Sequence, residues 1–300
     1  MCKSEPAGLY LHVPFCRRKC PYCDFYSVSG ADAACMEAYQ QAVCRNLRWY
    51  GNGAAVDSIY FGGGTPSLLP PDVIRAILTE AAACFSVREP EVTLEVNPAT
   101  VTAQQIRAYR EAGVNRLSIG VQSLIPEELV LLGRLHTAEA AKQTVWAAAQ
   151  AGFSNLSCDL MLGTPGQTAD SLERTLNQLL ELPIVHLSAY LLKVEPGTPY
   201  AAQHMEQQAA DEDMAADLYL QTVNFLEQNG FLQYEVSNFA KPGFESRHNL
   251  NYWRRGEYIG LGVAASSFID GRRFTNTFSI DEYMNAIIYN KTPEISSDVI

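Results

Sequence analysis

Three cysteines lie close together near the start of the chain, within the segment "HVPFCRRKCPYCDF". They are Cys16, Cys20 and Cys23, which gives the spacing C-x-x-x-C-x-x-C. A closed zinc site uses four protein ligands, whereas a cubane iron–sulfur cluster held by three thiolates keeps one iron without a protein ligand. The spacing therefore predicts a 4Fe–4S cluster whose open iron can bind a small molecule directly.

Two other interpretations of these cysteines stay open on spacing alone. One is a zinc site completed by a remote ligand such as His12, and the other is a redox pair made of Cys20 and Cys23. His12 alternates with apolar residues in a strand-like run, and this pattern favours a barrel-interior histidine with satisfied nitrogens. The other cysteines show no ligand spacing, and we expect them to be small apolar side chains: Cys2, Cys35, Cys44, Cys84 and Cys158.

Six strand-like runs alternate with helical patterns and must position these cysteines. The runs are "GLYLHVP", "DSIYFGGG", "EVTLEVNP", "VNRLSIGVQS", "NLSCDLMLG" and "VHLSAYLL". This rhythm predicts parallel βαβ units, as found in a doubly wound sheet or in a TIM-like barrel. The unusual residues fall at or just beyond the ends of successive strands, and such ends converge on one face of a barrel. We therefore predict an α/β fold, an open and incomplete (β/α)6 barrel.

The character of the sequence changes near residue 200. The segment "EDMAADLYLQTVNFLEQNGF" has the pattern of one amphipathic helix, and short aromatic-rich strands and turns follow it. We therefore predict a barrel core over residues 1–200 and a smaller C-terminal α/β extension over residues 201–300.

The composition limits the classes of function. With 300 residues, 47% of them hydrophobic, the chain can bury a sizeable core. A formal net charge of −11 argues against a nucleic-acid partner, because phosphate binding needs concentrated Lys and Arg. There is no apolar N-terminal signal segment and no apolar run long enough to span a bilayer. We therefore expect a cytoplasmic protein, in a reducing compartment where clustered cysteines bind metal.

Glycines and acids at the strand ends suggest a ligand site beside the cysteines. The run "YFGGGTPS" follows the second strand, and glycine allows close approach of the backbone to a ligand. Glu95 stands at a strand end, where its carboxylate can accept hydrogen bonds from a ribose. Asp159 is a lone acid in an otherwise apolar strand, and a buried charge needs a partner.

"HVPFCRRKCPYCDF" resembles the signature of the radical S-adenosylmethionine superfamily, and its flanks resemble the oxygen-independent coproporphyrinogen oxidase family. The resemblance implies that the cofactor's amino and carboxylate groups chelate the open iron, and that one electron from the cluster cleaves the sulfonium. It also implies which residues contact S-adenosylmethionine: Tyr10, Tyr22, Gly63, Gly64, Thr65, Glu95, Gln122, Arg134 and Asp159.

Two departures from the oxidase branch favour the haem chaperone branch of that family. The oxidases have a second cysteine two residues after the last ligand, where this chain has Phe25, and they carry an N-terminal extension for which this chain has no room. The segment "HNLNYW" also resembles the chaperone branch. An imidazole can ligate haem iron and aromatic rings can pack on a porphyrin. The resemblance implies haem contacts at His248, Asn249, Tyr252 and Trp253.

The resemblance implies haem as bound cargo, delivered to an acceptor protein such as a membrane-bound respiratory enzyme, and an electron donor for the cluster. Two alternatives remain: an oxygen-independent coproporphyrinogen III oxidase, and a zinc-stabilised binding module. Whether S-adenosylmethionine is cleaved in function stays open. Members of the family continue into a C-terminal helical domain, which we expect to be missing from this chain.

Overall fold

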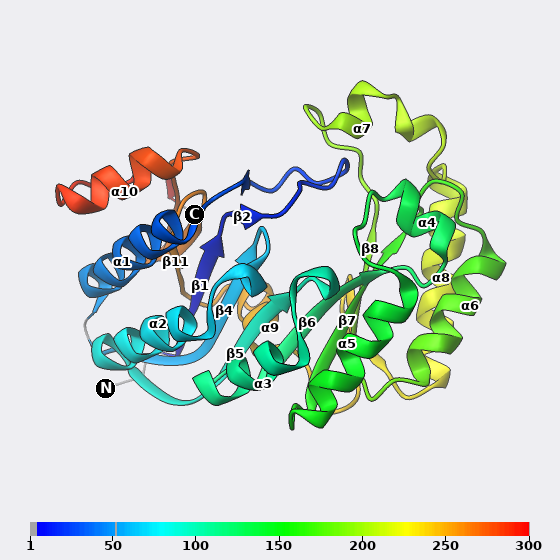
Figure 1. The fold of residues 1–300 in the computed structure, drawn as a ribbon, viewed down its shortest axis with the longest axis horizontal. Coiled ribbons are helices and arrows are strands. Elements are labelled where there is room, and N and C mark those ends of the chain that lie inside the picture. The colour runs from blue at the N-terminus through cyan, green and yellow to red at the C-terminus, as the bar shows by residue number, and fades with distance from the viewer. Residues whose placement is uncertain (1–4, 52, 300) are drawn as a thin grey trace.

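Six parallel strands form the centre of the molecule in the computed structural model, which describes residues 5–51 and 53–299. They follow one another across the sheet in chain order: β1 (Ala7–Val13), β4 (Ala55–Gly63), β5 (Ser86–Val96), β6 (Arg116–Gln122), β7 (Asn155–Leu162) and β8 (His186–Leu191). Figure 1 shows them from blue β1 to yellow-green β8. The six predicted strands are confirmed.

The sheet continues at both edges and does not close. Beyond β1 lie β11 (Tyr258–Leu261), which is parallel to it, and the antiparallel strands β12 (Ser266–Ile269), β13 (Arg272–Asn276) and β14 (Glu294–Val299). Beyond β8 lie β10 (Asn238–Ala240) and β9 (Leu232–Glu235). The open barrel is thus confirmed. The residues after 200 extend its sheet by hydrogen bonding at the two edges, and the boundary at 200/201 stays a prediction.

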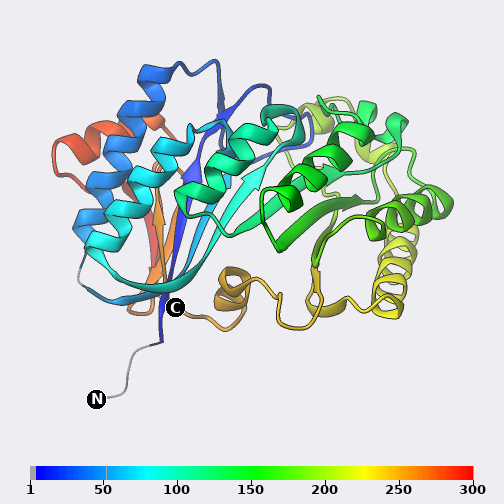
Figure 2. The same ribbon diagram turned by 60° about the horizontal axis from the view of Figure 1, so that its bottom comes forward.

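Helices cover the outer face of the sheet (Figure 2). The larger ones are α1 (Ala33–Tyr50), α2 (Pro71–Cys84), α3 (Ala103–Ala112), α5 (Ala138–Gln150), α6 (Ala169–Leu180) and α8 (Glu212–Gln228). Their starts are encoded locally: the Asp32 carboxylate caps α1, and Thr102 with Gln105 forms a capping box on α3. The predicted amphipathic helix after residue 200 is α8. The core between helices and sheet contains Leu9, which is fully buried.

Shorter elements complete the fold. The cysteine segment runs from β2 (Phe15–Cys16) to β3 (Val28–Ser29), and these two strands pair with each other. The short helices are α4 (Pro126–Leu131), α7 (Pro199–Ala202), α9 (Arg247–Trp253) and α10 (Ile280–Ile288), with 3₁₀ turns η1 (Pro66–Leu68), η2 (Pro98–Thr100) and η3 (Met205–Gln207). In the part of the chain that the structure describes, no helix combines the length and the apolar character needed to span a membrane.

Candidate functional site

A cavity of about 440 Å³ opens where the parallel strands end, and the three clustered cysteines line it. We call it the cysteine cavity. The predicted cofactor residues that also line it are Tyr22, Gly63, Gly64, Thr65, Glu95, Gln122, Arg134 and Asp159. Tyr10 lies elsewhere. Residues from the first five parallel strands and their loops thus meet at one end of the sheet, as expected for a (β/α) barrel.

The start of the cysteine segment is fixed by its neighbours. The Thr65 N–H donates to the Phe15 carbonyl at 2.8 Å, and the Cys16 Sγ lies 3.4 Å from the Thr65 Oγ1. Farther along, the Arg17 guanidinium donates to the Ala99 carbonyl at 2.8 Å. The segment is therefore held against the strand ends even where its side chains are exposed.

Residues beyond the cysteine motif support the middle of the segment, and sequence reasoning missed them. The Tyr200 N–H donates to the Pro21 carbonyl at 3.0 Å, and the Tyr200 hydroxyl donates to the Leu131 carbonyl at 2.6 Å. A Cβ at Gly133 would lie 2.7 Å from the Pro21 Cδ, so glycine lets the chain pass there. Nothing in the sequence pattern around Tyr200 or Gly133 indicates this role.

The glycine run is required by packing of the chain against itself. Gly63 has a φ of +109°, and a Cβ there would lie 2.6 Å from the His12 ring. A Cβ at Gly64 would lie 2.8 Å from the Val13 carbonyl oxygen. Side chains at either position would push the loop away from β1. The glycines thus allow the loop after β4 to lie close to β1 and the cysteine segment. This packing alone requires them, independently of any ligand.

Two carboxyl groups face the cysteine cavity from neighbouring strands. Glu95 accepts hydrogen bonds from the Tyr60 hydroxyl at 2.9 Å and from the Gly63 N–H at 3.2 Å. Burial, together with the nearby Asp159 carboxyl, raises the pKa of Glu95 to about 8. Burial also raises the pKa of Asp159, which accepts from the Ser118 hydroxyl at 2.8 Å. Two such acids favour a ligand that brings positive charge into the cavity.

Arg134 approaches the cysteines. Its guanidinium donates to the Gly120 carbonyl at 2.9 Å, to the Tyr22 hydroxyl at 3.4 Å and to the Cys20 Sγ at 3.5 Å. Its Nε is buried and has no hydrogen-bond partner among the described residues. The Arg134 side chain is therefore held in the wall of the cysteine cavity. A cation beside the thiols stabilises thiolate and sulfide charge.

The donor set fits an iron–sulfur cluster. Within residues 5–51 and 53–299, no three His, Cys, Asp or Glu side chains gather closely enough to hold one metal ion. A cubane cluster differs, since it binds each thiolate through a separate iron and so spreads them. Three half-buried thiols on one wall, a guanidinium beside them and an orphaned buried donor match a large anionic cluster.

The zinc alternative with His12 as a fourth ligand has no support in this geometry. His12 does not line the cysteine cavity. Its Nε2–H donates to the Tyr26 carbonyl at 2.9 Å, and its Nδ1 lies 3.2 Å from the Tyr10 hydroxyl. The prediction of a satisfied interior histidine is confirmed. Of the remaining cysteines, Cys44 and Cys158 are buried, Cys35 and Cys84 are half-buried, and Cys2 lies outside the described residues.

The "HNLNYW" segment forms α9, which packs on the inner face of β1 and β4. The Glu91 carboxylate accepts from the Arg247 N–H at 3.0 Å and fixes the start of the helix. The His248 side chain is only 1% exposed, and its Nδ1 and Nε2 lie 3.1 Å from the Ser58 hydroxyl and 2.8 Å from the Tyr252 hydroxyl. Burial lowers the pKa of His248 to about 3. The imidazole is thus neutral and fully engaged.

The other predicted haem residues are more accessible than His248. Trp253 is 58% exposed and Tyr252 is 37% exposed, while Asn249 is half-buried and its N–H donates to the Ser246 hydroxyl at 3.4 Å. The aromatic side chains at the end of α9 are therefore the members of this segment that a large ligand can reach.

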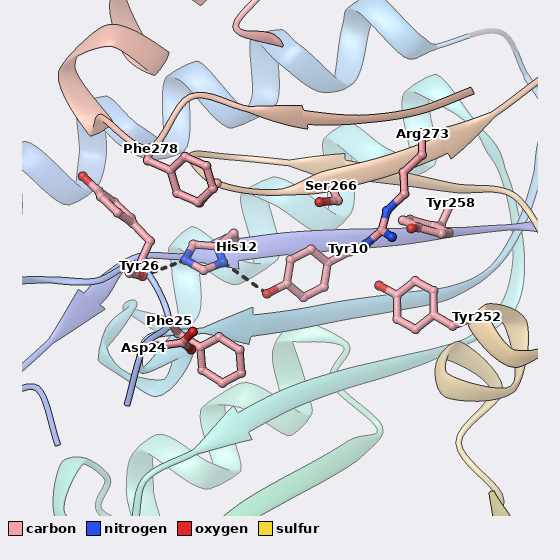
Figure 3. A pocket seen from close by; sticks show the side chains of 11 residues that line it. Tyr10, His12, Asp24, Phe25, Tyr26, Tyr252, Tyr258, Ser266, Arg273 and Phe278 are labelled. Atoms are coloured by element: carbon pink, nitrogen blue, oxygen red, sulfur yellow. Dashed lines mark hydrogen bonds between the residues drawn. The ribbon is translucent and has the colours of Figure 1, made fainter. Parts of the chain in front are cut away.

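Tyr10 lines a second cavity of about 610 Å³, which we call the aromatic cavity (Figure 3). Its walls include Tyr10, Tyr252 and Tyr258, and it lies beside β1 and the strands β11 to β13. Asp24 and Phe25 line both cavities, so the two adjoin at the end of the cysteine segment.

Several further residues line the cysteine cavity and were not predicted. Tyr60, Ser118 and Tyr190 come from β4, β6 and β8. Ser118 stands four positions before the predicted Gln122 on the same strand, so alternation points both side chains to the same face of the sheet. That alternation could have identified Ser118. It does not apply to Tyr60, three positions before Gly63, or to Tyr190, whose strand carries no predicted residue.

Comparisons with known proteins agree with this geometry. A family model of the radical SAM superfamily matches residues 10–179. The heme chaperone HemW of Escherichia coli is 40% identical over 92% of this chain and 75% of its own length. The bovine mitochondrial radical S-adenosyl methionine domain-containing protein 1 is 41% identical over 87% of this chain and 60% of its own length.

A solved structure shares the fold. The coproporphyrinogen III oxidase HemN of Escherichia coli has a TM-score of 0.87 and 23% identity, and the match covers 99% of this chain and 73% of that one. The chain therefore belongs to the radical SAM superfamily and, within it, to the HemW family. Membership implies a 4Fe–4S cluster, which supplies an electron when bound, and S-adenosylmethionine. Cys16, Cys20 and Cys23 would hold the cluster.

Proposed function

We propose that this protein is a radical SAM-type haem chaperone, which binds haem and delivers it to an acceptor protein. The observation that carries the proposal is the 40% identity to the heme chaperone HemW over 92% of the chain. The resemblance to HemN supports the fold alone, because only 23% of the residues are identical. The acceptor is proposed to be a membrane-bound respiratory protein, and a separate protein donates electrons to the cluster.

The cysteine cavity is the proposed cofactor site of this chaperone. Cys16, Cys20 and Cys23 bind the cluster, and Arg134 offsets its negative charge at 3.5 Å from the Cys20 Sγ. Glu95 and Asp159 face the cationic groups of S-adenosylmethionine, and the Glu95 carboxylate is held in place by two hydrogen bonds. Pairing with these cations offsets the cost of burying the carboxylates.

The α9 segment is the proposed haem contact, with different roles for its members. Tyr252 and Trp253 are exposed and offer aromatic faces to the macrocycle. His248 positions Tyr252 through the 2.8 Å contact between the Nε2 and the hydroxyl. Direct ligation of haem iron by His248 would first have to break that contact. Asn249 lies in the first turn of the same helix and is the fourth proposed haem contact.

Titration of the anaerobically reconstituted protein with haemin, followed by the Soret absorbance, tests the proposal. We expect saturable binding of one haem per chain, and weaker binding by His248→Ala because Tyr252 loses its support. The control is Glu173→Gln, which removes an exposed acid on α6. Absence of saturable binding by the unmodified protein would refute the chaperone function.

A further inference from the structure

The aromatic cavity combines aromatic side chains in its walls with one cationic side chain, Arg273. Tyr10 and Tyr258 are half-buried in it, and Tyr252 contributes its ring from α9. Figure 3 shows Phe25 and Phe278 at the same end of the cavity, on either side of His12. Both phenylalanines are exposed, at 64% and 58%, so they present apolar surface to solvent that a bound ligand would cover.

Arg273 is the cation of this cavity. It comes from β13, and Figure 3 shows its guanidinium directed to the space beside Tyr10 and Tyr258. The guanidinium forms no ion pair or side-chain hydrogen bond with any part of the chain that the structure describes. Its neighbour Arg272 differs, since it is bound to Glu294 and stacks on Phe274 at 4.9 Å.

The two charged residues of the aromatic cavity would orient a charged ligand, because they lie at opposite ends. Asp24 lies beside Phe25, at the end that adjoins the cysteine cavity, and Arg273 lies at the opposite end (Figure 3). An anionic group would be repelled by Asp24 and attracted by Arg273. In a chain with a formal net charge of −11, a guanidinium at this position is well suited to recognise a carboxylate.

The size of the cavity agrees with a large flat ligand. Its volume of about 610 Å³ exceeds the 440 Å³ of the cysteine cavity. Cavities of about 300 to 1000 Å³ commonly hold ligands of drug size, with apolar walls and a few polar groups that set the orientation. A flat macrocycle with carboxylates at one edge matches all three features. Its faces can pack on the aromatic rings, and its carboxylates can bind Arg273 at the end away from Asp24.

We infer that the aromatic cavity is the binding site of the tetrapyrrole cargo, with the macrocycle against Tyr10, Tyr252 and Tyr258 and a propionate on Arg273. This inference rests on the proposed haem-binding function and assigns its location. The edge opposite the propionates then lies beside Phe25, next to the cysteine cavity. The imidazoles of His12 and His248 stay engaged with their own partners and support Tyr10 and Tyr252.

Substitution of Arg273 combined with removal of the ligand's charge tests the inference. Haemin and haemin dimethyl ester, whose propionates are uncharged, are titrated into the reconstituted protein and into Arg273→Gln. We expect Arg273→Gln to weaken haemin binding about fivefold, the upper range for a partly exposed charge pair, and to leave binding of the ester unchanged. Arg273→Lys should recover most of the affinity for haemin.

Two further variants provide the controls. Arg107→Gln removes an exposed arginine on the outer face of α3 and should leave both affinities unchanged. Phe278→Ser changes an exposed rim residue, so the fold persists, and it should weaken haemin and its ester alike. Circular dichroism and the melting temperature of each variant verify folding.

The outcomes separate this inference from the function on which it rests. If the unmodified protein binds no haemin, the chaperone function fails and this site fails with it. If it binds haemin and Arg273→Gln binds equally well, the function stands and the assigned site is wrong. An equal loss for haemin and its ester would also overturn the role of Arg273 as a propionate partner.

Discussion

The cysteine cavity and the aromatic cavity adjoin but are built in different ways. The cysteine cavity contains acids, a guanidinium and thiols, most of which are hydrogen bonded to the surrounding chain, as Glu95 is to Tyr60 and Gly63. The aromatic cavity contains tyrosine and phenylalanine rings and Arg273, whose guanidinium forms no ion pair within residues 5–51 and 53–299. The first is arranged to hold charged groups in one geometry, and the second offers aromatic surface between two opposite charges, Asp24 and Arg273.

The difference indicates two kinds of binding. Preorganised charged groups give geometric specificity, because each is already oriented before the ligand arrives. Apolar walls with exposed rings at the rim give affinity through buried area and allow a ligand to leave again. A tightly held cofactor in one cavity and a transferable cargo in the other would suit a chaperone. Four predictions sharpen or break this comparison.

The largest effect should come from Cys20→Ala. Removal of one of three thiolates leaves two cluster irons without protein ligands, so we expect complete loss of cluster assembly. Iron and sulfide analysis after anaerobic reconstitution measures it, with Cys84→Ala, a half-buried cysteine on α2, as the matched control. Haemin affinity should not change. A simultaneous loss of haemin binding would show that the two cavities depend on each other.

The next effect concerns the buried acids. Glu95→Gln keeps the shape of the side chain but cannot take up the negative charge that Glu95 acquires when it pairs with a cationic cofactor. S-adenosylmethionine should therefore bind about 10- to 100-fold more weakly, as for loss of a charged hydrogen-bond partner. Calorimetry on the reconstituted protein gives the affinity, and Glu173→Gln on the exposed face of α6 is the control. An unchanged affinity would remove Glu95 from the cofactor site.

The same substitution should stabilise the protein at alkaline pH. The pKa of Glu95 is raised from 4.5 to about 8, so between these values the folded chain retains a proton that the unfolded chain releases. Ionisation of Glu95 therefore favours the unfolded state progressively as the pH rises from about 4.5 to 8. Above pH 8 the folded state has lost all of this stabilising free energy. Without added cofactor, Glu95→Gln should melt several degrees higher than the unmodified protein at pH 9. The two melting temperatures should converge towards pH 4.5, and a constant difference would contradict the prediction.

The smallest effect should come from Tyr252→Phe. It keeps the ring in the aromatic cavity and removes only the hydroxyl that lies 2.8 Å from the His248 Nε2. We expect haemin affinity to fall by at most about threefold, since one neutral hydrogen bond contributes little net free energy. Tyr289→Phe, at a site that is 70% exposed, is the control in the same titration. A loss as large as that of His248→Ala would point to the Tyr252 hydroxyl itself as a haem contact.

Local sequence was sufficient to predict the six parallel strands and much of the cysteine cavity. Strand and helix periodicity predicted β1 and β4 to β8, because apolar side chains facing the helices repeat at fixed intervals. Gly63, Glu95 and Asp159 were predicted together because the carboxyl ends of parallel strands must meet. The cysteine spacing also acts locally, since the ligands are seven positions or fewer apart in the chain.

Only the tertiary structure decided how the chain after residue 200 is placed. No short-range pattern shows that β11 pairs with β1, since strand pairing over such a separation depends on the whole sheet. That pairing brings Tyr258 and Arg273 to the side of Tyr10 and creates the aromatic cavity. It also encloses His248, whose two nitrogen partners, Ser58 and Tyr252, were invisible in the sequence. The sequence by itself determined which side chains could bind a cluster and its cofactor. Long-range packing decided which aromatic residues share a cavity with Arg273.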